Sequence, residues 1–278
     1  MATQQEVVKK TTGTGMAKWQ DRIAQDMDRQ DKMEASIQTL QRYQIKTGNL
    51  SLNDKLIPGS EIVVSIAWNL FENVRYDHDY DPSNPEPPNC WARGDDDKAM
   101  TPHEIIVAAG FAKAETCAQC QYSAFGSAER GAGKGCQNRR ALATIATGTL
   151  INGKFKPFTE AELEKSDIIL LSVPPTSFKA ISAYLKTAKA ITHKPPYLLN
   201  TRIKTEPNSD TIYQMTFELE SEIPEKLLDP IMNKLDLAEE ALNTPYALPV
   251  EHVEKPKGGG RRGSTATKTA ATKGGNRY

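Results

Sequence analysis

The cysteines are the feature that most constrains this chain. The sequence contains four, and they lie between positions 90 and 136: Cys90, Cys117, Cys120 and Cys136. Two residues separate Cys117 from Cys120, a spacing at which two thiolates bind one tetrahedral Zn²⁺, and the other two cysteines complete the ligand set. A four-cysteine site has no position left for water. The pattern therefore predicts a structural zinc ion rather than a catalytic one.

The segment between these cysteines has many glycines, alanines and charged residues and little hydrophobic periodicity. Such a segment is ordered more readily by a metal than by an apolar core of its own. The alternatives are four unrelated cysteines or a disulfide pair. No apolar run is long enough to span a membrane, and the polar first residues lack a secretory signal. We therefore expect the cytoplasm, where thiols stay reduced.

The charge of the chain is distributed unevenly. The sequence has 35 basic and 35 acidic residues, but Lys255–Tyr278 contains seven basic residues and no acidic one. The rest of the chain is left with 28 basic against 35 acidic residues. A basic tail rich in glycine, threonine and alanine is typical of flexible segments that attract polyanions, although a solubilising role is the simpler alternative.

Hydrophobic patterning divides the rest of the chain. We expect a disordered leader over 1–15, an N-terminal helical segment over 16–50, a core over 51–245 and a disordered basic tail over 246–278. Within the core, the patterns predict strands at 61–76, 141–151, 167–173, 197–205 and 211–219, and helices at 176–190 and 224–242. The cysteine module occupies 90–140. The sum is an α+β fold of about five strands.

The loop between Cys120 and Cys136 combines glycines with basic and aromatic residues. Its GAGKG run fails the phosphate-binding loop pattern, because Gly135 stands where that pattern needs Ser or Thr. Basic side chains that track a phosphate backbone, with aromatic rings that stack on bases, are the requirement for binding a single strand. The candidate phosphate contacts are Arg130, Lys134, Arg139 and Arg140, and the candidate stacking rings are Trp91, Tyr122 and Phe125. The alternative is that these rings pack against the module and the basic residues are solvated.

Several short segments resemble a family of tailed-phage single-stranded DNA-binding proteins. They include Met16–Trp19, Ile57–Gly59, Pro87–Cys90, Cys117–Cys120, Gly133–Arg140 and Pro174–Ser177. The resemblance covers roughly residues 16–220. It implies an OB-like β-barrel with an inserted zinc module, as in the helix-destabilising protein of T-even phages. Proteins of this class often end in an acidic tail, whereas the tail of this chain is basic.

These observations predict a non-catalytic, largely sequence-independent single-stranded DNA-binding protein of phage replication or recombination. Its expected partners are single-stranded DNA and phage replication or recombination proteins, in the cytoplasm of the infected host. One alternative is a zinc- or magnesium-dependent nucleic-acid enzyme of the nuclease type, whose local candidate is the cluster Asp77, His78, Asp79 and Asp81. Another is a non-enzymatic adaptor that uses its N-terminal helices. We assign no catalytic residue.

Overall fold

The longest strand, β4 (Glu61–Arg75), is the centre of the fold. Its sequence is rich in β-branched and aromatic residues, and most of them are buried, as in a strand that is covered on both faces. β4 pairs antiparallel with β6 (Cys136–Ala146) on one edge. On its other edge it pairs with β10 (Leu199–Asn208) near its start and with β5 (Cys90–Gly94) near its end. The strand predicted at 61–76 is confirmed.

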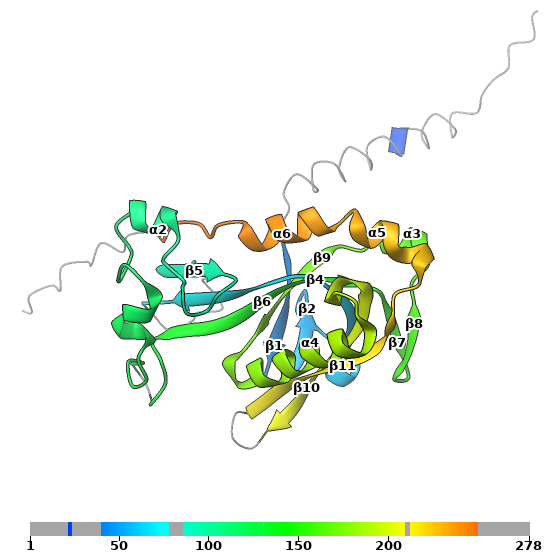
Figure 1. Ribbon diagram of the computed structural model, residues 1–278, viewed down its shortest axis with the longest axis horizontal. Coiled ribbons are helices and arrows are strands. Elements are labelled where there is room, and N and C mark those ends of the chain that lie inside the picture. The colour runs from blue at the N-terminus through cyan, green and yellow to red at the C-terminus, as the bar shows by residue number, and fades with distance from the viewer. Residues whose placement is uncertain (1–21, 24–39, 78–85, 130, 209–211, 250–278) are drawn as a thin grey trace, which may run out of the picture.

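The computed structural model describes residues 22–23, 40–77, 86–129, 131–208 and 212–249. Within these ranges, nine strands form one curled mixed sheet in the order β11-β10-β4-β6-β9-β1-β2-β3, with β5 beside β4 (Figure 1). The strands not yet located are β1 (Gln41–Lys46), β2 (Asn49–Leu52), β3 (Lys55–Leu56), β9 (Ile168–Val173) and β11 (Ile212–Glu222). β1 runs parallel to β9, and the other pairings are antiparallel. A separate hairpin is formed by β7 (Gly148–Ile151) and β8 (Lys154–Pro157).

Helices cover the two faces of the sheet. The helix α4 (Phe178–Thr192) buries Ile181, Tyr184 and Ala188 in a core shared with β4, β9, β10 and β11. On the other face, α6 (Leu235–Asn243) buries Ala238, Ala241 and Leu242 against β4 and β6. Two short helices, α3 (Glu160–Glu164) and α5 (Leu228–Met232), extend this second layer. The expectation of an α+β fold is confirmed.

The cysteine module lies at one end of the sheet, between β4 and β6 in the chain (Figure 1). It contains β5, the short helix α2 (Glu104–Ala108) and two single 3₁₀ turns, Cys117–Gln119 and Gln121–Ser123. A small cluster around Val74, Trp91 and Ile106 forms its apolar centre. The module therefore has a minor core of its own, which its sequence pattern did not predict.

Several boundaries differ from the sequence predictions. Residues 41–50, assigned to the N-terminal helical segment, form β1 and the start of β2. β10 continues to Asn208, past the predicted end at 205, because it pairs with β11 throughout. The helix predicted at 224–242 is broken into a 3₁₀ turn, α5 and α6. The leader over 1–15 and the basic residues of the tail lie outside the described residues. No helix in the described ranges is long and apolar enough to cross a membrane.

Candidate functional site

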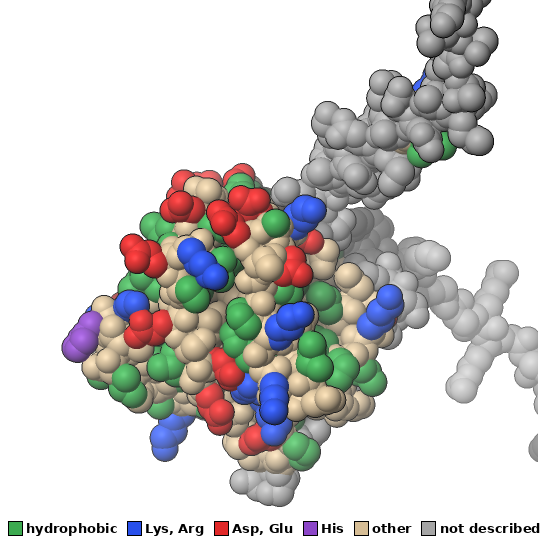
Figure 2. Space-filling view, turned by 90° about the vertical axis from the view of Figure 1, so that its right-hand side faces the viewer, with side chains coloured by type: hydrophobic (Ala, Val, Ile, Leu, Met, Phe, Trp, Pro, Cys, Tyr) green, Lys and Arg blue, Asp and Glu red, His purple; other side chains and the backbone are tan. Residues whose placement is uncertain are grey.

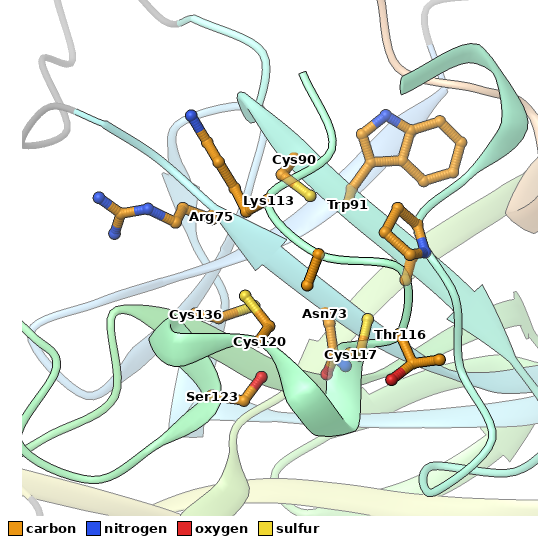
Figure 3. Close-up of a pocket in the computed structure, with 13 residues that line it drawn as sticks. Asn73, Arg75, Cys90, Trp91, Lys113, Thr116, Cys117, Cys120, Ser123 and Cys136 are labelled. Carbon is orange, nitrogen blue, oxygen red and sulfur yellow. The ribbon is translucent and has the colours of Figure 1, made fainter. Parts of the chain in front are cut away.

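The four cysteines line one small cavity at the junction of the module and the sheet (Figure 3). Cys90 begins β5 and Cys136 begins β6, and both pair with Arg75 of β4 from opposite sides. Cys117 and Cys120 come from the 3₁₀ turn beside them. All four are free thiols. The chain thus brings cysteines from three separate segments to the lining of one cavity, and their binding of zinc stays a prediction.

The thiols do not form a closed cage. Cys90 and Cys136 are separated by the width of β4, so their Cα atoms are about 10 Å apart at ordinary strand spacing. In the described part of the chain, no group of three or more His, Cys, Asp or Glu side chains is close enough to hold a metal ion as placed. The cavity between the thiols measures about 20 Å³, which is room for one water-sized particle. Four soft donors around a space of this size suit a single Zn²⁺ if the sulfurs move inward.

Electrostatics at three of the thiols favour the neutral form. Burial is the largest cause that raises the pKa of Cys90, Cys117 and Cys136, and the pKa of Cys136 reaches about 12. The other thiols raise these values further, because neighbouring negative charges repel. Hydrogen bonding by Asn73 partly offsets the shift at Cys117. The thiols of Cys90, Cys117 and Cys136 therefore need a nearby positive charge to become thiolates.

Arg75 ties the loop of the module to the sheet. Its guanidinium lies 3.7 Å from the ring centroid of Tyr122 and donates a hydrogen bond of 3.3 Å to the carbonyl oxygen of Gly135. Arg75 also forms an ion pair of 3.2 Å with Asp77. Ser127 accepts a hydrogen bond from the amide of Gly135 at 2.9 Å. The loop is thus held at both ends, with one face of Tyr122 covered by Arg75.

Trp91 requires a correction. We predicted a base-stacking ring, but the side chain is only 1% exposed. Its ring stacks on His103 at a centroid distance of 3.9 Å and meets Tyr246 edge to face. The reason is the pleat of β5, which turns Trp91 into the small core of the module. Trp91 stabilises the module and is not available to a ligand.

Next to the thiol cavity lies an open groove of about 880 Å³. The module forms one wall, and β1, β9 and the start of α4 form the other. Asn73 and Cys136 line both the groove and the thiol cavity, so the two spaces share a wall. The cationic side chains of the lining are Arg42, Lys134 and Arg139, and its aromatic side chains are Tyr43, Phe71, Phe125, Phe178 and Tyr213. Asp97 is the acidic member of the lining.

The groove brings together three of the predicted contact residues: Phe125, Lys134 and Arg139. Phe125 is 82% exposed, and the ammonium of Lys134 lies 5.0 Å from its ring centroid. Arg140 lies outside the lining, because its guanidinium is hydrogen-bonded to Asn69 at 2.6 and 3.0 Å. Arg130 lies outside the described residues.

Sequence reasoning missed Arg42, Phe178 and Tyr213 as contact residues. They come from β1, α4 and β11, which are far apart in the chain and meet only through the topology of the sheet. No local signal in the sequence marks them. Phe71 of β4 also lines the groove.

Asp77 is the one residue of the proposed magnesium-binding cluster that lies within the described residues. Its carboxylate forms ion pairs with Arg75 and with Lys113, the latter at 3.4 Å. His78, Asp79 and Asp81 lie outside the described residues. Asp77 therefore anchors one basic side chain of β4, Arg75, and one of the module, Lys113.

Comparison of the chain with protein-family models, with curated proteins and with solved structures finds no match.

Proposed function

We propose that this protein binds single-stranded DNA in the groove between the cysteine module and the sheet, and that one structural Zn²⁺ at the four cysteines orders the module. The resemblance of its short segments to tailed-phage proteins supports a role in phage DNA replication or recombination. The observation that carries the proposal is the lining of the groove, which combines three cationic side chains with five aromatic ones.

The order of the strands supports an OB-like barrel. β4, β6 and β9 form an antiparallel meander, α4 follows, β10 returns to pair with β4, and β11 pairs with β10. An OB-fold is a five-stranded, partly open barrel that binds oligonucleotides on the face of its second and third strands, between two loops. β6 and β9 are the second and third strands of this path. The cysteine module is inserted in the loop between the first and second strands, next to the groove.

The chemistry of the groove matches an unpaired strand. Arg42, Lys134 and Arg139 supply charges for phosphates, and exposed Phe125 supplies a face for a base. β6 begins before its pairing with β9 does. Its first residues, Cys136–Arg139, pair with β4 on one edge, and the pairing with β9 on the other edge begins at Arg140. Stacking and phosphate contacts need no particular base, so we expect the affinity to depend little on the DNA sequence.

The end of the molecule away from the module has a different surface. Basic and acidic side chains are interspersed there, with single apolar side chains between them (Figure 2). Mixed charges of this kind give no continuous track for a polyanion. The excess of acidic residues outside the tail is therefore compatible with DNA binding at the end of the molecule that carries the module.

The role proposed for zinc is to hold the module in place. Cys90, Cys117, Cys120 and Cys136 supply the thiolates, and the ion neutralises their charge. Zinc binding therefore shapes one wall of the groove, which carries Phe125 and Lys134.

The test is a fluorescence anisotropy titration of a labelled oligothymidylate at several salt concentrations, with the metal content of the same preparation measured. We expect one zinc ion per chain and binding that weakens steeply with salt, because cations are released from the phosphates. Replacement of Lys134 by Gln should reduce the slope of log K against log salt by about 0.7. The matched control is Lys154→Gln, since Lys154 is exposed on β8, outside the groove.

Phe125→Ala tests the stacking contact. We expect it to weaken binding by about 1–3 kcal/mol without lowering stability, because the ring is exposed. Ile151→Ala removes an exposed apolar side chain at β7 and serves as its control. A zinc-loaded protein that does not bind the oligonucleotide at low salt would contradict the proposed function. A purified protein free of transition metal would contradict the zinc site.

A further inference from the structure

Two side-chain hydrogen bonds connect Lys134 to the wall between the thiol cavity and the groove. Lys134 donates to the Oδ1 atom of Asn138 at 3.2 Å, and Asn138 donates from Nδ2 to the Oδ1 atom of Asn73 at 2.6 Å. Asn73 and Cys117 both line the thiol cavity. Asn73 and Asn138 are direct partners across β4 and β6, so the strand pairing itself aligns their amides.

The direction of this chain is fixed by its first member. An ammonium group can only donate, so the Oδ1 atom of Asn138 must face Lys134. The Nδ2 group of Asn138 then donates to the Oδ1 atom of Asn73. The lysine therefore fixes the orientation of both amides.

Burial gives these bonds their importance. Asn73 is 4% exposed and lines both the thiol cavity and the groove (Figure 3). A buried amide that loses its partner pays the cost of an unsatisfied polar group, so Asn73 has few alternative arrangements. Lys134, by contrast, stands on a glycine-rich loop and gains a fixed position only through its contacts with Asn138 and Phe125.

We infer that Asn73 and Asn138 are positioning residues that set the ammonium of Lys134 against a phosphate of the bound strand. The inference deepens the proposed function and rests on it for the identity of the ligand. Neither asparagine touches the metal or needs to touch the DNA. Their part is to hold the lysine where a phosphate passes.

The first test needs no DNA. The rate at which an amine-acylating reagent modifies Lys134 is measured by mass spectrometry of the intact, folded protein after digestion. In Asn138→Ala we expect this rate to rise about three- to tenfold, because the ammonium loses its acceptor, while the rate at Lys154 and the zinc content stay the same. Asn138→Ser is the second variant, in case the alanine variant is unstable. An unchanged rate at Lys134 in a folded variant overturns the inference.

The second test is a double-mutant cycle in the oligothymidylate titration. Lys134→Gln, Asn138→Ala and the double variant should weaken binding by similar factors, and each should reduce the salt slope by about 0.7, because all remove the same phosphate contact. Gln121→Ala, on the exposed surface of the module, is the control and should bind like the wild type. If the loss of affinity in the double variant equals the product of the losses in the two single variants, the inference is overturned.

The two tests separate the inference from the proposed function. If the protein does not bind the oligonucleotide but Lys134 becomes more reactive in Asn138→Ala, the proposed function is wrong and the positioning of the lysine stands. If the protein binds DNA but the effects of Lys134→Gln and Asn138→Ala on affinity are independent, the proposed function stands and the positioning inference is wrong.

Discussion

Gly135 occupies a position where a side chain has no room. A Cβ atom there would lie 2.9 Å from the carbonyl oxygen of Ser127 and 3.0 Å from the Nη1 atom of Arg75. We expect Gly135→Ala to destabilise the module by about 1–3 kcal/mol, because the loop must shift away from Arg75. Thermal unfolding and zinc content measure the effect.

Gly133 provides the matched control, since a Cβ atom there would meet only the Cβ of Ala128 at an ordinary 3.8 Å. Gly133→Ala should leave both measurements unchanged. Equal effects at the two glycines would show that the close approach at Gly135 is not what constrains the loop.

At the residue scale, the sequence identified the cysteines and part of the groove. Spacing alone predicted that Cys90, Cys117, Cys120 and Cys136 meet, and they share one cavity. Composition alone could not separate Trp91 from Phe125, since both are aromatic residues near cysteines. The structure buries the first and exposes the second, because Trp91 stands on a paired strand and Phe125 on a loop.

At the element scale, an irregularity in β4 limits what the alternation of side chains along a strand can predict about the face on which each residue lies. The register with β6 shifts between Ile66 and Trp68, so the side-chain parity of the strand reverses there. Before the shift, Ile62, Val64 and Ile66 face the core under α4. After it, Phe71 reaches the same side and contacts Phe178. A bulge of this kind leaves no clear mark in a run of apolar residues, so the groove face of β4 could not be predicted.

The short helix α2 depends on a neutral histidine. The Nδ1 atom of His103 accepts a hydrogen bond of 3.3 Å from the amide of Ile105, at the start of the helix, and its ring stacks on Trp91. Burial lowers the pKa of His103; the charge of Arg93 lowers it further and that of Glu104 opposes the shift. The unfolded chain therefore binds a proton at a higher pH than the folded one.

The sign of the pH dependence follows from this shift. The contribution of His103 to stability is complete above the ordinary histidine pKa of 6.5 and is lost as the pH falls through the lower pKa of the folded state. His103→Asn keeps a capping acceptor that does not titrate. We expect the melting temperature of this variant to fall less between pH 7 and pH 5 than that of the wild type. Parallel pH profiles for the two proteins would contradict the role of His103.

At the scale of the whole molecule, the segment after α6 joins the helical layer to the cysteine module. The guanidinium of Arg93 in β5 donates to the carbonyl oxygens of Leu242 and Thr244 at 2.5 and 2.7 Å. Tyr246 then packs against Trp91. We had assigned residue 246 to a disordered tail, but its ring belongs to the core of the module. The sequence could not show this, because the contact joins residues more than 150 positions apart.

The buried carboxylate of Glu72 is the centre of this junction, and it yields the last prediction. Glu72 is 1% exposed, and its Oε1 atom accepts hydrogen bonds from Arg93 at 2.8 Å and from the hydroxyl of Tyr246 at 2.9 Å. Tyr246→Phe removes the second donor and leaves the ring in place. A hydrogen bond to a buried charged group contributes about 1.5–3 kcal/mol, so the free energy of unfolding should fall by that amount.

Chemical denaturation measures the effect, and Tyr197→Phe is the control, since Tyr197 is a half-buried tyrosine packed in the second core. Tyr246→Ala should cost more than Tyr246→Phe, because it also removes the ring that covers Trp91 and the guanidinium of Arg93. If the junction holds the module against the sheet, Tyr246→Ala should also weaken oligothymidylate binding, although Tyr246 is not among the residues that line the groove. Unfolding free energies for Tyr246→Phe and Tyr246→Ala equal to that of the wild type would mean that this junction does not hold the module against the sheet.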